Sequence, residues 1–379
     1  MKIVIAPDSF KGSLTSVEAS KIIDKALKDF DPHIETVQIP MADGGEGTVD
    51  AVLWNRGGDM VSCRVCDPFG RIIVAQYGWL EEKKTAIIET AAASGLPLLD
   101  KAELDPERAS SFGTGELIKE ALDKGAEKII LGLGGSATID GGTGLFQALG
   151  VKFFDENLNE LSWLGGRLDR ISAMDPTGLD PRLPSVKITI ASDVTNPLLG
   201  SDGAVTVFGP QKGLSASQLE IFEKGMRSFA ELVARQTGKS MVNEPGSGAA
   251  GGIGFLMRTL LVVEFRSGLE MIAEMAGLAK QLEDADLVLT GEGRIDGQSL
   301  FGKVPVGIGR LAKGAGVPVI AFAGSIGPGT EHLEYEGVNV VMPMSEGPTS
   351  LSEAMLHSEK LLYNASMRLM KIVRIGSMA

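Results

Sequence analysis

The chain has 379 residues, of which 44% are hydrophobic and 22% are charged, and its formal net charge is −13. This length exceeds the size at which one hydrophobic core usually keeps growing, so we expect two domains. The acidic balance argues against a nucleic-acid partner, because such a partner requires a basic face. No apolar run is long enough for a signal peptide or a membrane span, so we expect a cytoplasmic protein with no membrane partner.

The first residues alternate between strand and helix patterns. The apolar run Lys2–Ala6 is typical of a strand in a parallel sheet that is covered on both faces. Thr15, followed by Glu18 three residues later, is a capping box, and it predicts a helix over residues 16–28. A strand at residues 35–39 and another helix come next. This βαβα order is typical of a doubly wound sheet.

The pattern changes after residue 60. Residues 61–65, 72–79 and 85–88 read as antiparallel strands, with a turn over Asp67–Gly70 between the first two. Cys63 and Cys66 form a C-x-x-C pattern within the first of these strands. Their spacing places them on opposite faces of the strand, and no further ligands lie at zinc-site spacing. We therefore expect neither a redox nor a metal role for these cysteines.

The remaining elements lead to a two-domain expectation. Strands are predicted over residues 128–133, 187–191, 287–290, 317–323 and 338–342, a long helix over 217–236, and a last helix capped by Ser350 with Glu353. We expect an α/β fold in which both chain ends form a doubly wound, Rossmann-like parallel-sheet domain, with a second mixed α/β domain inserted. The expected ranges are 1–60 plus 285–379 for the first domain and 61–284 for the second.

Five of the predicted strands end in a polar loop that contains glycine and an acid. The acids are Asp8, Asp43 with Glu46, Asp140, Asp193, and Glu292 with Asp296. Ligands of open α/β sheets bind at the carboxyl ends of the strands, where such loops gather. Glycine and aspartate also simply make turns, which is the alternative for any single loop. The five loops together predict a ligand cleft that is rich in acids.

Such a cleft suits phosphoryl transfer, which needs N–H donors around the phosphate, a divalent metal and a carboxylate near the acceptor hydroxyl. Glycine lets a backbone approach phosphate closely, so Gly134-Gly135-Ser136 is the best phosphate cradle in the sequence. Lys11, Lys212 and Lys303 are the lysines set in glycine loops, and a solvated surface position is the alternative for each.

Two other nucleotide motifs are present only in part. Gly297-x4-Gly302-Lys303 has the spacing of a P-loop, but Val304 replaces the residue that should bind magnesium. Gly132-x-Gly134-x-x-Ala137 follows a strand as a dinucleotide fingerprint would, with Asp155 after the next apolar run. This second pattern keeps an NAD-dependent oxidoreductase of a small hydroxy acid as an alternative function. A catalytically silent metabolite-binding protein is another.

Several loops together resemble one known family, the bacterial glycerate kinases with a two-domain fold. The resemblance runs from Lys2 to about Pro343, and it is carried by residues 6–15, 40–48, 134–138, 208–213 and 290–299. It implies ATP- and Mg²⁺-dependent phosphorylation of D-glycerate in the cleft between the domains. The expected product is 2-phosphoglycerate, with 3-phosphoglycerate as the alternative, and a homo-oligomer is compatible with the sequence. One position departs from the family pattern, because Ile139 stands where the family has asparagine.

The resemblance suggests a role for each loop. Asp193 is expected to act as general base or metal ligand. Lys11 is the second expected catalytic residue, and together with Asp8 it would meet the glycerate carboxylate or the transferring phosphate. The expected glycerate-binding residues are Asp8, Ser9, Asp43, Asn196 and Arg294. The expected nucleotide- or phosphate-binding residues are Gly134, Gly135, Ser136, Lys212 and Lys303. Glu292 and Asp296 are the expected magnesium ligands.

Overall fold

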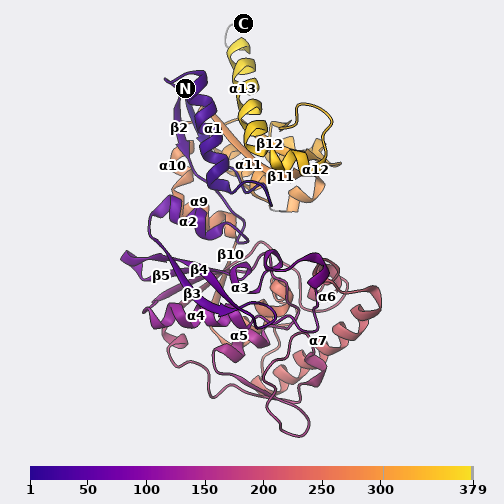
Figure 1. The fold of residues 1–379 in the computed structure, drawn as a ribbon. Helices are drawn as coiled ribbons and strands as arrows, with labels where there is room; N and C mark the ends of the chain where they lie inside the picture. Colours follow the sequence, from indigo (N-terminus) through magenta and orange to yellow (C-terminus); the bar gives the residue numbers. More distant parts are fainter. Residues whose placement is uncertain (302, 377–379) are drawn as a thin grey trace. The chain divides into compact units, whose positions relative to one another are not determined.

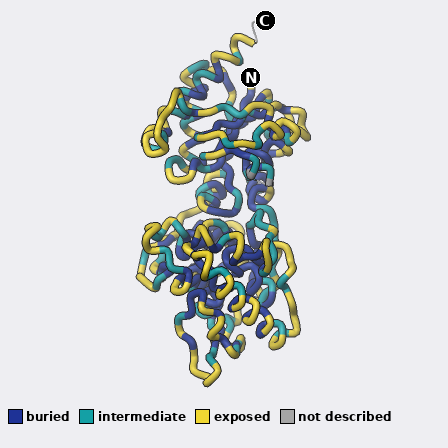
Figure 2. The backbone as a smooth tube through the Cα atoms, turned by 90° about the vertical axis from the view of Figure 1, so that its right-hand side faces the viewer, coloured by how far each residue is buried: buried dark blue, intermediate teal, exposed yellow. Residues whose placement is uncertain are grey.

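The computed structural model describes residues 1–301 and 303–376, and these form two compact units. Unit 1 contains Met1–Asp43, Asp50–Gly57 and Gly268–Ala379, and unit 2 contains Gly44–Val49 and Gly58–Ser267. The expected domain ranges differ from these units at residues 44–49, 58–60 and 268–284, which they placed in the other domain. Figure 2 shows that buried segments run through the interior of each unit, while exposed residues lie along its outer loops.

Unit 1 is built on a five-stranded parallel sheet in the order β13-β12-β11-β1-β2. Its strands (Figure 1) are β1 (Lys2–Ile5), β2 (Glu35–Gln38), β11 (Leu287–Ile295), β12 (Val319–Ile326) and β13 (Val340–Pro343). Its helices are α1 (Ser16–Phe30), α2 (Thr48–Arg56, which unit 2 shares), α9 (Gly268–Ala276), α10 (Leu278–Leu282), α11 (Val304–Ala315), α12 (Leu351–Leu356) and α13 (Ser358–Gly376).

Apolar side chains cover both faces of this sheet. Ile3 and Ile5 pack with Ile23 of α1 and Leu362 of α13 in one cluster. On the opposite face, Ala321 and Ala323 of β12 pack with Val306 of α11 and with Leu333. A parallel strand covered in this way is apolar throughout, which is why β1 was recognisable in the sequence.

Unit 2 holds a six-stranded mixed sheet in the order β10-β9-β6-β5-β4-β3, beside the small hairpin β7-β8. Its strands are β3 (Asp59–Cys66), β4 (Ile72–Leu80), β5 (Thr85–Glu89), β6 (Lys128–Gly132), β7 (Lys152–Phe154), β8 (Ala173–Asp175), β9 (Lys187–Ala191) and β10 (Val263–Arg266). Its helices are α3 (Ala91–Ser94), α4 (Phe112–Asp123), α5 (Thr143–Ala148), α6 (Ala204–Phe208), α7 (Ala216–Thr237) and α8 (Ile253–Leu260). The predicted antiparallel pairing of the first three strands is confirmed.

Local signals in the sequence were accurate. The capping box of Thr15 and Glu18 is present at the start of α1, and Gly238 ends α7 in the left-handed conformation. The capping box of Ser350 and Glu353 is also confirmed, although its helix ends at Leu356 and α13 begins two residues later. Cys63 and Cys66 are free thiols, and burial raises the pKa of each to about 11.

One predicted boundary is wrong. We expected a loop to begin at Gly291, but β11 continues to Ile295, so Glu292 and Arg294 lie on a strand. The reason is non-local, because the extension of β11 pairs with the end of β12 up to the register of Ile295 with Ile326. Glycine at position 291 weakens a strand on its own, and the neighbouring strand compensates.

Candidate active site

Unit 1 contains a cavity of about 510 Å³ at the carboxyl end of its sheet. The chain leaves β1 toward β2 on one side and leaves β11 toward β12 on the other, so the strand order reverses between β1 and β11. Ligands of open α/β sheets bind at such a reversal point. The sequence-predicted site residues that line this cavity are Asp8, Ser9, Lys11, Asp43, Glu292, Arg294 and Lys303.

Asp8 is the most deeply buried acid of this cavity, with 5% of its surface exposed. Its carboxylate accepts a 2.7 Å hydrogen bond from the backbone N–H of Ser9. Burial raises its pKa well above the ordinary value, and the negative charge of Asp43 adds to the effect, while the Ser9 N–H and Lys11 oppose it. Two carboxylates held close together in this way favour a proton or a cation between them.

Glu292 projects from β11 into the same cavity. Its carboxylate accepts a 2.8 Å hydrogen bond from the hydroxyl of Ser299 and lies 3.6 Å from the ammonium group of Lys303. Burial raises the pKa of Glu292, whereas Lys303 and Ser299 oppose that rise. The carboxylate is therefore positioned by two neighbours and still faces the cavity.

Asp296 has a different environment from Glu292. Its carboxylate is paired with the guanidinium group of Arg294 at 2.8 Å, and its backbone N–H donates to the hydroxyl of Ser299. Arg294 lines the cavity, and its side chain is 65% exposed. Asp296 thus holds an exposed arginine in place beside the cavity.

The remaining predicted residues belong to unit 2, and four of them, Gly134, Gly135, Ser136 and Lys212, lie in or against the loop after β6. Lys212 is buried, and its ammonium group donates 2.8 Å hydrogen bonds to the hydroxyl of Ser136 and to the carbonyl of Thr138. Burial lowers the pKa of Lys212 to about 7, with a small opposing effect from Asp140. Gly135 is exposed at the tip of this loop, so its backbone is accessible to an anion.

Asp140 anchors the other end of the same loop. It is fully buried, and its carboxylate accepts hydrogen bonds from the backbone and hydroxyl of Ser111 and from the N–H groups of Gly142 and Gly144. Burial raises its pKa, and these donors oppose the rise. Ile139 beside it is fully buried in the core of unit 2, so this departure from the family pattern fills the core.

The glycines of this region serve backbone packing. A Cβ on Gly134 would lie 2.4 Å from the Cα of Gly45, and a Cβ on Gly44 would lie 2.5 Å from the carbonyl oxygen of Ala191. The N–H of Gly134 also donates to the carbonyl of Gly44 at 3.2 Å. The loop after β6 and the Gly44–Gly45 segment therefore touch backbone to backbone, which only glycine permits.

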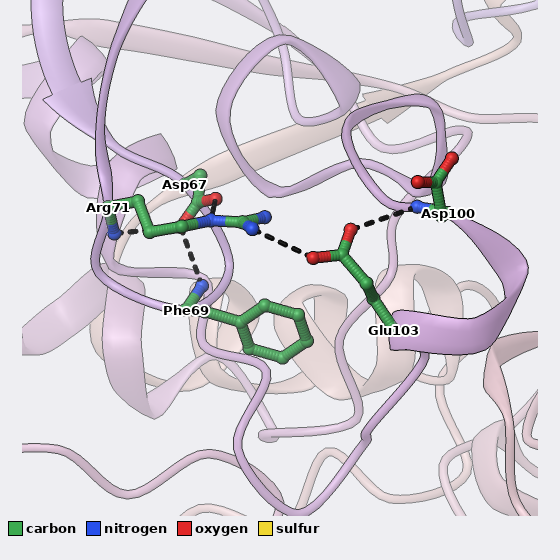
Figure 3. Close-up of polar contacts among 5 residues, drawn as sticks. All are labelled: Asp67, Phe69, Arg71, Asp100 and Glu103. Atoms are coloured by element: carbon green, nitrogen blue, oxygen red, sulfur yellow. Dashed lines mark hydrogen bonds and ion pairs between the residues drawn. The ribbon is translucent and has the colours of Figure 1, made fainter.

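A polar cluster fixes the turn after β3 to the segment that follows α3. Figure 3 shows Arg71 between the carboxylates of Asp67 and Glu103, at 2.9 Å from the latter. Glu103 is the last residue of the segment 96–103. The first residue of that segment, Leu96, donates its N–H to the carbonyl of Gly135 in the glycine loop at 2.8 Å. The turn after β3 is thereby connected to the predicted phosphate cradle.

Asp193 and Asn196 follow β9, also in unit 2. Both are half-buried, and the side-chain amide of Asn196 donates to the carbonyl of Asp202 at 2.8 Å. The structure thus places the predicted residues in two sets, one in each unit. Sequence reasoning missed the apolar wall of the unit 1 cavity, because its residues are scattered along the chain and carry no motif.

Comparisons with known proteins show which family the chain belongs to. The model of the glycerate kinase family matches residues 3–374. The chain belongs to the glycerate kinase family. It is 42% identical to a glycerate kinase of Halalkalibacterium halodurans, over 96% of both chains. It is also 42% identical to a glycerate 2-kinase of Escherichia coli, over 99% of both chains.

A solved structure shares the fold as well. A crystal structure from Salmonella typhimurium LT2, described as a candidate glycerate kinase 2, matches over 100% of both chains with a TM-score of 0.85 and 39% identity. The protein is therefore an α/β enzyme of the glycerate kinase family, with a parallel sheet in unit 1 and a mixed sheet in unit 2.

Three further expectations from the sequence concerned membrane-spanning helices, the P-loop-like pattern and the dinucleotide-like pattern. Within residues 1–301 and 303–376, no helix is both long and apolar enough to cross a bilayer. Gly302 of the P-loop-like pattern lies outside the described residues. The helix after the dinucleotide-like pattern begins only at Thr143, so the tight strand-to-helix turn of that motif is replaced by the loop that Lys212 holds.

Proposed function

We propose that this member of the glycerate kinase family transfers the γ-phosphoryl group of ATP to D-glycerate and forms 2-phosphoglycerate. The observation that carries the proposal is the cavity at the strand-order reversal, where Asp8, Asp43 and Glu292 face Lys11 and Lys303. Phosphoryl transfer depends on positioning and charge neutralisation rather than on covalent chemistry. A cavity with both acids and cations supplies those two needs.

The cationic groups of unit 1 are proposed to bind anions. Lys11 and Lys303 would neutralise phosphate oxygens, and Arg294, held by Asp296, would bind a carboxylate or phosphate in a two-pronged contact. Ser9, Asp8 and Asp43 remain the proposed partners of the glycerate hydroxyls. Asp8 is suited to that role because its raised pKa lets it exchange a proton with a hydroxyl.

The loops of unit 2 are proposed to bind an anionic group and to activate the acceptor. The loop Gly134–Ser136 would bind a phosphate through the exposed backbone of Gly135, because the N–H of Gly134 already donates to the carbonyl of Gly44 and Ser136 is buried. Lys212 would contribute by fixing Ser136 and Thr138, since its ammonium group is already bound to both. Asp193 remains the proposed general base, and Asn196 the proposed orienting residue beside it.

The residues of unit 1 fit a magnesium ion that arrives with the nucleotide. Among the residues that the structure describes, no group of three or more His, Cys, Asp or Glu side chains could hold a metal by itself. Magnesium commonly uses one or two carboxylates together with substrate phosphates, and Glu292 beside Asp8 fits that pattern. Asp296 is less suited than the sequence suggested, because Arg294 occupies its carboxylate. When bound, the ion would neutralise charge on the phosphates.

The proposal is tested by a coupled assay of ADP release. We expect ADP to form only when D-glycerate, ATP and magnesium are all present, and we expect Lys11→Ala to lower kcat/KM. Retention of full activity by Lys11→Ala would exclude Lys11 from the site. ADP release at the same rate with and without glycerate would contradict phosphorylation of glycerate itself.

A further inference from the structure

The unit 1 cavity has an apolar half to which the proposed chemistry assigns no role. Its wall is formed by side chains from the loop after β1, the end of β13, α12 and α13, namely Phe10, Met344, Leu351, Ala354, Met355 and Leu361. Pockets of about 300–1,000 Å³ typically hold drug-sized ligands, and this cavity measures about 510 Å³. Glycerate has three carbons and would leave most of this volume unfilled. The cavity is therefore sized for a larger ligand.

Met355 of the apolar wall packs closely against Gly12, which is the residue after Lys11. Gly12 follows Lys11, its φ is +77°, and a Cβ on it would lie 2.8 Å from the Cε atom of Met355. A side chain at position 12 would displace Met355 from the loop that carries Lys11. The geometry thus places an apolar surface beside a lysine, as a ligand with an apolar end and an anionic end requires.

The side chains of the wall are also suited to packing against an aromatic ring. Met344 and Met355 present flexible, polarisable side chains that pack well against aromatic rings. Leu351 is 74% exposed although it lines the cavity, and a bound ring would remove part of this apolar surface from water. Ser325 and Ser345 line the same cavity and offer hydroxyl groups to the polar edge of such a ring.

We propose that this apolar half binds the purine base of ATP, with the phosphates directed toward Lys11 and Lys303. This inference rests on the proposed function for the identity of the ligand as a nucleoside triphosphate. It assigns the base to the region between Phe10, Met344 and Met355. The exposed backbone of Gly135 is left for anionic groups.

The test measures nucleotide binding by the intact chain without relying on turnover. Titration calorimetry with ADP would compare wild type with Ala354→Phe, which fills the apolar half, and with Met355→Ala, which removes part of its wall. Losing the burial of one apolar group of this size weakens binding by about tenfold or more, so the Kd for ADP should rise by that factor in both variants. The Kd for inorganic tripolyphosphate, which has no base, should stay within about twofold.

Leu356→Ala is the matched control, because Leu356 lies on the same short helix, is 77% exposed and is absent from the lining of this cavity. Its Kd for ADP should equal that of wild type. Unchanged ADP binding in Ala354→Phe and Met355→Ala would overturn the base-binding inference, even if glycerate-dependent ADP release proved the kinase activity. Weakened ADP binding in both variants, with no glycerate turnover by wild type, would support the inference and reject the proposed acceptor.

Discussion

The ammonium group of Lys212 donates a 2.8 Å hydrogen bond to the hydroxyl of Ser136, which lies 76 positions earlier in the chain. The same group donates to the carbonyl of Thr138, so one buried lysine fixes both sides of a short bend in the glycine loop. Burial holds the pKa of this lysine at about 7. Its charge is therefore costly to the fold at and below neutral pH.

This pKa makes a prediction about stability and pH. Between about pH 7 and about pH 10.4 the unfolded chain binds more protons at Lys212 than the folded chain does, so this group makes the free energy of unfolding increase as the pH rises. Lys212→Met removes that increase. Urea unfolding at about pH 7 and about pH 9 should show a smaller change between the two pH values in the variant than in wild type. The exposed Lys224→Met is the control, and an equal change in wild type and Lys212→Met would show that Lys212 does not titrate there.

Asp8 gives a prediction of the opposite sign. Its folded pKa is raised, so between the unfolded value of about 3.9 and the folded value the folded chain binds more protons, and this group makes stability fall as the pH rises. Asp8→Asn should therefore raise Tm at neutral pH while lowering kcat, as expected where a functional group costs stability. The gain in Tm should shrink as the pH approaches 4. Glu283→Gln, at an exposed position, should change neither quantity, and a lower Tm for Asp8→Asn at neutral pH would refute the account.

Gly134 is predicted to tolerate no side chain. Gly134→Ala would bring a Cβ to 2.4 Å from the backbone of Gly45, and neither backbone segment can move aside as a flexible side chain would. We expect a lower Tm and a loss of glycerate-dependent activity. Gly314→Ala is the matched control, because a Cβ there meets nothing within 4 Å and the helix α11 should gain up to about 1 kcal/mol. Wild-type Tm and activity in Gly134→Ala would show that the two glycine segments are not packed together.

Structural features that are encoded by neighbouring residues could be predicted from the sequence, whereas features that depend on distant parts of the chain could not. The capping box of Thr15 and Glu18 is encoded within four residues, and it was predicted correctly. The extension of β11 to Ile295 depends on pairing with β12, and the sequence near Gly291 gave no sign of it. The burial of Lys212 likewise depends on a loop far away in the chain, so its motif indicated a glycine-bordered lysine but not that its ammonium group is already bound.

The cavity of unit 1 combines residues that could be predicted from the sequence with residues that could not. Asp8, Lys11 and Asp43 follow the ends of recognisable strands, so their clustering could be predicted. Its apolar wall comes from Phe10 and from residues around Met355, which are ordinary core-like residues in the sequence. Only the folded chain brings that wall beside Lys11, through the close approach of Met355 to Gly12.

Asp193 is predicted to carry the proton transfer. General-base catalysis typically contributes about 10²–10⁴-fold, so Asp193→Asn should lower kcat by at least about 100-fold while leaving Tm nearly unchanged. Asp202→Asn, at an exposed acid in the following loop, should retain wild-type kcat. A kcat within about tenfold of wild type in Asp193→Asn would assign the base to another group, with Asp8 the next to be substituted.

The central claim, transfer of the γ-phosphoryl group of ATP to the 2-hydroxyl of glycerate, is tested most directly by proton-coupled phosphorus NMR of the reaction mixture. The γ-phosphate resonance of ATP should decline, and a new phosphomonoester signal should grow, only when D-glycerate is present. That signal should be a doublet, because the phosphate of 2-phosphoglycerate is attached to a carbon with one hydrogen. A triplet would instead indicate 3-phosphoglycerate, and inorganic phosphate as the sole new signal would contradict glycerate phosphorylation altogether.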